Sequence, residues 1–146
     1  MIKNLTVSNK TKQKLNKREI HKLVSVLKEE LKFELESISI NFLTEEQIIP
    51  INNSFLGHNY STDIITFNYS GENYTLDGEI FISLDDADFY AKKYDVNLKN
   101  EILRLVIHGF LHLLGYDDVN ANDKRKMKRL ENSLVKKHLN FLTKLY

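Results

Sequence analysis

Residues 108–118 read HGFLHLLGYDD, and this stretch determines how the C-terminal half of the chain folds. Residues four positions apart lie on one face of a helix, with Cβ atoms about 5–6 Å apart. We therefore expect His108 and His112 to present imidazole nitrogens to a single cation. Gly115 favours the left-handed conformation that ends helices, so the chain can turn back and bring Asp118 to the same cation.

Two imidazoles and one carboxylate supply three ligands, which leaves one coordination position open. Catalytic zinc has three protein ligands and a water molecule, whereas structural zinc is usually closed by four protein ligands. The sequence therefore predicts one catalytic Zn²⁺ ion held by His108, His112 and Asp118, although nickel and iron accept the same ligands. Asp117 is the alternative acidic ligand. The spacing favours Asp118, and Asp117 then stabilises the turn or supports the ligands from outside.

The same spacing occurs in extended zincin motifs of metallopeptidases. Those motifs carry a glutamate directly after the first histidine, which acts as the catalytic base. This chain has Gly109 at that position, so a small zinc peptidase is the least favoured interpretation. We expect Gly109 to leave space beside the metal instead.

The composition is that of an ordinary globular domain. The chain has 146 residues, of which 42% are hydrophobic and 28% are charged, and we expect one domain over residues 1–146. It contains no cysteine, which excludes disulfides and thiolate metal ligands. No apolar run reaches membrane-spanning length and the first residues lack a signal-peptide pattern. We therefore expect a soluble cytoplasmic protein without a membrane partner.

The charges are distributed unevenly along the chain. Residues 1–23 hold seven Lys or Arg and one acid, and residues 124–146 hold eight Lys or Arg and one acid. The 100 residues between them hold six Lys or Arg and eighteen acids. Basic ends that meet in space would form a phosphate-binding face. The alternative is that these lysines only solvate helices.

Hydrophobic periodicity predicts an α/β fold with a mixed sheet of about four strands covered by about five helices. Alternation favours strands at 2–8, 37–43, 63–69 and 76–84, the last two as an antiparallel hairpin. Helices are expected to begin near Asn16, Thr44, Asp85, Asn97 and Asn122. The metal site then lies on the C-terminal half of the fourth helix and the turn after it. His21 and His138 are expected to be exposed helix residues.

The stretch at 108–118 resembles the H-G-x-L-H-L-x-G-Y-D-H signature of the YbeY family of metal-dependent endoribonucleases. Asp118 stands where the family has a third histidine. Residues 51–67, INNSFLGHNYSTDIITF, are similar to the family's L-N-x-x-Y-R-x-K-D-x-P-T-D-V-L-S-F. Residues 77–83 are similar to its G-D-I-x-I-S strand. In this alignment Leu56 replaces the family's arginine, and His58 falls at its lysine.

The resemblance implies a single-strand-specific endoribonuclease of rRNA maturation, acting near the 3′ end of 16S rRNA and in ribosome quality control. It also implies precursor rRNA and ribosomal or ribosome-assembly proteins as partners, and no DNA. A bound cation lowers the pKa of its water toward about 7, which supplies hydroxide for phosphodiester hydrolysis. His58 is the candidate catalytic residue, since it can contact phosphate when cationic or transfer a proton when neutral. The alternative is a histidine on a surface loop.

A second hypothesis is a metal-stabilised ribosome-assembly factor that binds RNA without cutting it. Leu56 motivates it, because leucine can neither pair with phosphate nor stabilise a developing negative charge.

Overall fold

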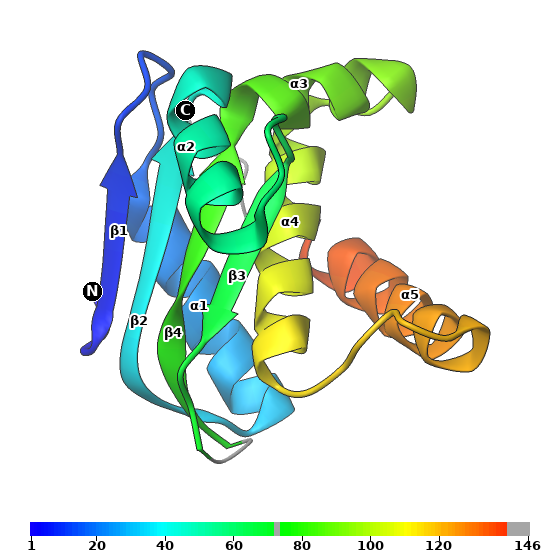
Figure 1. The fold of residues 1–146 in the computed structure, drawn as a ribbon. Coiled ribbons are helices and arrows are strands. Elements are labelled where there is room, and N and C mark those ends of the chain that lie inside the picture. Colours follow the sequence, from blue (N-terminus) through cyan, green and yellow to red (C-terminus); the bar gives the residue numbers. More distant parts are fainter. Residues whose placement is uncertain (72–73, 140–146) are drawn as a thin grey trace.

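The computed structural model describes residues 1–71 and 74–139 (Figure 1). These residues form an α/β fold with four strands and five helices, as expected. In chain order the elements are β1 (Leu5–Asn9), α1 (Lys17–Leu31), β2 (Glu34–Leu43), α2 (Glu45–Leu56), β3 (Ile64–Asn68), β4 (Thr75–Ser83), α3 (Leu84–Lys93), α4 (Leu98–Leu113) and α5 (Ala121–His138).

The four strands form one mixed sheet in the order β1-β2-β4-β3. β1 pairs with β2 in parallel and β2 pairs with β4 in parallel, whereas β3 and β4 are antiparallel. Parallel neighbours need a crossover connection, and α1 supplies it between β1 and β2. The expected hairpin of the last two strands is therefore confirmed.

Helices cover the two faces of this sheet unequally. α1 and α4 lie on one face and α2 lies on the other, while α5 packs against α4 (Figure 1). The main core lies between the sheet and α1 and α4, and it includes Ile40, Ile80 and Phe110, all fully buried. A smaller cluster of Leu43, Ile48 and Ile65 lies under α2.

Helix caps occur close to the positions that the sequence indicates. The side chains of Asn16, Thr44 and Asn97 accept hydrogen bonds from backbone N–H groups in the first turns of α1, α2 and α4. These bonds satisfy donors that have no partner inside a helix. Asn120 caps α5, so that helix begins one residue before the expected Asn122.

Two histidines that we expect to be exposed are buried. His21 on α1 and His138 on α5 are each only 6% exposed. Nε2 of His138 lies 3.1 Å from Oε1 of Glu30, and Nζ of Lys137 lies 2.9 Å from Oε2 of the same glutamate. The C-terminal end of α5 therefore packs against α1, a long-range contact that periodicity along one helix does not reveal.

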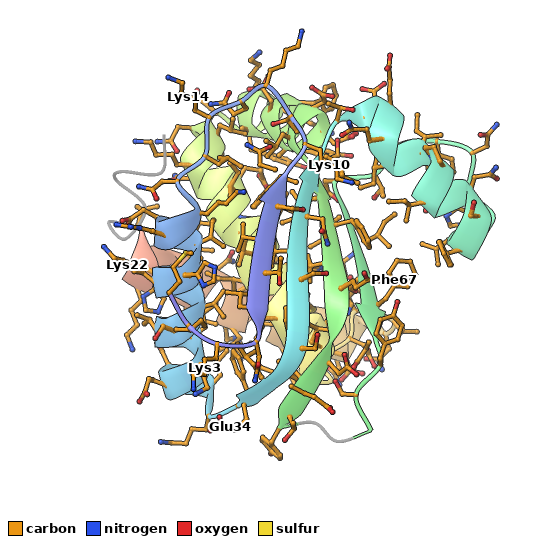
Figure 2. The ribbon with its side chains drawn as sticks, turned by 90° about the vertical axis from the view of Figure 1, so that its left-hand side faces the viewer. Lys3, Lys10, Lys14, Lys22, Glu34 and Phe67 are labelled. Carbon is orange, nitrogen blue, oxygen red and sulfur yellow. The ribbon has the colours of Figure 1, made fainter. Side chains whose placement is uncertain are left out.

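The two basic ends of the chain do not contribute equally to the cleft beside the predicted metal ligands. Lys3 precedes β1, Lys10 and Lys14 lie in the loop that follows it, and Lys22 lies on α1 (Figure 2). Among the described residues, the lysines that line the cleft beside the predicted metal ligands come from α5. No helix in the described part of the chain combines the length and apolar character that a membrane crossing requires.

Candidate functional site

The three predicted metal ligands lie together in the structure. His108, His112 and Asp118 each offer one ligand atom, and these atoms all lie within 4.8 Å of one another. The two imidazoles come from successive turns of α4, with ring centroids 4.7 Å apart and ring planes at 69°. Two nitrogens and one carboxylate oxygen at this separation fit a divalent metal such as zinc, which binds such atoms at about 2.0–2.2 Å.

The turn after α4 explains how Asp118 reaches the histidines. α4 ends at Leu113, and Gly115 follows with a φ of 98°, a backbone conformation that residues other than glycine rarely adopt. The N–H of Tyr116 donates to the carbonyl of Leu111 at 3.0 Å, so the chain folds back over the last helical turn. Asp117 Oδ1 accepts a hydrogen bond from the N–H of Val119, consistent with the turn-stabilising role considered for it.

Gly109 has a different role from the one we expect. A Cβ at this position would lie 3.0 Å from Cδ1 of Ile80 and 3.3 Å from Cδ1 of Ile64. Gly109 therefore faces the sheet, not the space beside the ligands. Its lack of a side chain lets α4 pack closely on β3 and β4, which fixes the position of the neighbouring His108.

A buried carboxylate orients His108 from the side opposite the metal position. Nδ1 of His108 lies 2.6 Å from Oε1 of Glu131 on α5, whose side chain is only 4% exposed. Burial alone raises the pKa of the Glu131 carboxyl, but hydrogen bonds from His108 and Arg104 outweigh burial and lower that pKa to about 2. An ionised carboxylate only accepts hydrogen bonds, so the imidazole proton sits on Nδ1 and leaves Nε2 for an ion.

Two cations complete the environment of Glu131. Nη1 of Arg104 lies 2.6 Å from Oε2, and Nζ of Lys128 lies 3.1 Å from the same oxygen. These contacts balance the buried negative charge. Oε1 of Glu131 therefore contacts His108, while Oε2 contacts the two cations.

The surroundings of His112 favour its neutral form. Burial is the main cause that lowers the pKa of His112, and the nearby His108 lowers it further. The carboxylates of Asp118 and Asp117 oppose this shift without reversing it. A neutral imidazole is the form that binds a metal, because a protonated ring has no free lone pair.

Two of the three ligands, His108 and Asp118, line a cleft of about 670 Å³. Its walls come from the end of α3, from α4, from the start of β3 and from α5. The polar and aromatic residues that line it are Asp63, Tyr90, Tyr94, Glu101, Arg104, His108, Asp118, Lys124, Lys128, Glu131 and Asn132. Burial raises the pKa of the Asp63 and Glu101 carboxyls.

Sequence reasoning missed the residues that surround the ligands. The residues expected from the sequence do not include Glu131, Arg104 or Glu101, and they include Asp63 only within the motif at 51–67. One signal was available for Glu131, since it is the single acid among residues 124–146. A second was the helical spacing that places Glu101 and Arg104 on the same face as His108.

His58 lies apart from the ligand group. It follows α2 and its cap Gly57, it is exposed, and its ring stacks on Tyr60 with centroids 5.1 Å apart. Leu56, the last residue of α2, is 49% exposed. Among the described residues, neither side chain lines the cleft or joins the ligand group.

Comparisons with known proteins agree with the geometry. The family model described as "Endoribonuclease YbeY" matches residues 1–139. The chain is 38% identical over 127 residues to Endoribonuclease YbeY of Chlorobium limicola, covering 87% of this chain and 88% of that protein. It is 35% identical over 128 residues to the protein of the same name from Chloroherpeton thalassium, covering 88% and 90%. The solution structure of TM1509 from Thermotoga maritima is similar with a TM-score of 0.64 and 25% identity, covering 90% of this chain and 86% of that one.

Proposed function

Because the chain belongs to the endoribonuclease YbeY family, we propose that it is a metal-dependent endoribonuclease that hydrolyses phosphodiester bonds in single-stranded RNA. One observation carries this proposal: three ligand atoms lie within 4.8 Å of one another, and two of the residues that supply them, His108 and Asp118, line an open cleft. The names of the relatives do not favour the two alternatives, a binding factor without activity and a small zinc peptidase.

His108, His112 and Asp118 would hold the metal, and we propose that it is a single Zn²⁺ ion. When bound, it supplies a water molecule of lowered pKa as the nucleophile. Glu131 keeps the proton of His108 on Nδ1, and burial keeps His112 neutral. Lys124 and Lys128 at the edge of the cleft are placed to attract the phosphates of a bound strand.

We further propose that the substrate is precursor rRNA near the 3′ end of 16S rRNA, that the enzyme also serves ribosome quality control, and that it works in the cytoplasm with ribosomal or assembly proteins. Family membership supports these assignments. His58 is kept as a candidate catalytic residue. Its exposure leaves its ring accessible to a strand that extends beyond the cleft.

The test is RNA cleavage by the purified protein. Single-stranded RNA is incubated with protein that has been treated with a chelator and then reloaded with zinc. We expect cleavage only after reloading, and none by His112→Ala, whose folding is verified by circular dichroism. Absence of cleavage at every metal loading would refute the nuclease and favour the binding factor. Proteolysis of an unstructured protein that stops on His108→Ala would favour the peptidase.

A further inference from the structure

A pair of tyrosines lines the cleft without any role in holding the metal. Tyr90 and Tyr94 lie one turn apart at the end of α3, with ring centroids 6.1 Å apart and ring planes only 11° from parallel. Tyr94 is 62% exposed although it is a large aromatic residue. Both tyrosines border the same cleft as His108 and Asp118, so a molecule bound at the ligands can extend to them.

One cation, Lys93, lies close to both rings of this pair. Nζ of Lys93 lies 5.8 Å from the Tyr90 ring centroid and 5.6 Å from the Tyr94 ring centroid. Across the cleft, α5 presents the exposed side chains of Lys124 and Lys128. The acids that line the cleft are largely buried, except for the ligand Asp118. An occupant of the cleft therefore meets the two tyrosine rings, with Lys93 beside them, and the lysines of α5.

The length of the cleft fits a short piece of single strand. Val96, which precedes α4, also lines the cleft, and Glu101, Arg104 and His108 line it along α4. Glu101 and His108 are seven residues apart, which is about 11 Å along a helix axis. At the ~3.4 Å per nucleotide of a stacked strand, this length corresponds to about three nucleotides.

We propose that Tyr94 and Tyr90 stack an unpaired nucleobase while Lys124 and Lys128 bind the phosphates between that base and the metal ligands. This subsite rests on the proposed function and explains why that function is restricted to single strands. Aromatic side chains stack bases of any sequence, because each base has a π-face. In a duplex both faces of each interior base are covered by its neighbours, so the tyrosines have no face to stack on.

The test is binding without cleavage, measured by fluorescence anisotropy on chelator-treated protein. The probes are a short labelled RNA of adenosine and cytidine, which cannot pair with itself, and a blunt duplex made by annealing its complement. We expect Tyr94→Ala to bind the single strand about tenfold more weakly and the duplex unchanged. Tyr94→Phe keeps the ring and is expected to keep wild-type affinity. Tyr74→Ala removes an equally exposed tyrosine (69%) outside this cleft and serves as the control.

Lys124→Ala is expected to weaken the binding of both probes. It should also reduce the slope of log affinity against log salt concentration by about one. Single-strand affinity that survives in Tyr94→Ala, or falls equally in Tyr94→Phe, would overturn the stacking subsite. These measurements distinguish a failure of the stacking subsite from a failure of the proposed function. If the wild type cleaves RNA and Tyr94→Ala binds normally, only the subsite fails. If Tyr94→Ala loses single-strand binding while the wild type cleaves nothing, the subsite stands and the nuclease fails.

Discussion

Replacing Glu131 by glutamine should weaken metal binding without removing any ligand. In the structure Oε1 of Glu131 contacts Nδ1 of His108, while Oε2 contacts Arg104 and Lys128. The glutamine side chain has only one oxygen, and Arg104 and Lys128 attract that oxygen more strongly than the neutral imidazole of His108 does. The amide NH₂ then faces His108 and forces its proton onto Nε2, the atom that the metal needs.

The expected loss is in the range measured for residues that orient a metal-bound histidine, about 10-fold to 100-fold in affinity. This corresponds to about 1.4–2.8 kcal/mol of binding free energy. Zinc affinity is measured by competition with a chromogenic chelator, and the tautomer of His108 by ¹⁵N NMR of the metal-free protein. Glu29→Gln changes an exposed glutamate on α1 and serves as the control. Wild-type zinc affinity in Glu131→Gln, with the proton still on Nδ1, would refute the orienting role.

Three further predictions concern the third ligand, the hairpin and a buried histidine. Asp118→Ala should lower zinc affinity by at least about 100-fold, whereas Asp117→Ala should leave it near wild type; metal analysis after dialysis distinguishes the two, and the reverse result would exchange their roles. Gly78→Ala should destabilise the fold by about 3 kcal/mol in urea unfolding, because its Cβ would lie 2.3 Å from a backbone carbonyl oxygen of β3. Gly71→Ala, with nothing within 4 Å, should change little, and equal effects of the two would contradict this reason. Burial, aided by the N-terminal charge, lowers the pKa of His21 below 6.5, so its contribution to stability is complete above pH 6.5 and declines as the pH falls. His21→Leu should flatten this decline, measured by urea unfolding above and below pH 6.5, and an unchanged slope would assign the decline to other groups.

Local signals predicted the parts of the site that lie close together in the sequence. His108, His112 and Asp118 fall within eleven residues, so helix periodicity and one glycine are enough to bring them together. The helix caps were predictable for the same reason, since an Asn or Thr side chain satisfies backbone groups only two or three residues away.

The remaining features of the site and the fold depend on packing between elements that are far apart in the sequence, which local patterns do not indicate. Glu131 is 23 residues from His108, and its role depends on how α5 crosses α4. His21 and His138 are buried because α5 reaches α1, and neither helix alone determines that contact. In the sequence, Gly109 is informative because it stands where zincin motifs carry a catalytic glutamate. Its actual constraint comes from two isoleucines on the sheet.

The contact of Glu30 with Lys137 and His138 has a consequence for the distant ion site. α5 carries Glu131, and the ion pair of Glu30 with Lys137, together with its contact with His138, fastens the last turn of α5 to α1. Fraying from that end would loosen the helix toward Glu131, whose carboxylate controls the tautomer of a ligand. The contacts of Glu30 at the C-terminal end of α5 should therefore slow dissociation of the metal. Removing the Glu30 side chain should speed metal release while every coordinating group stays in place.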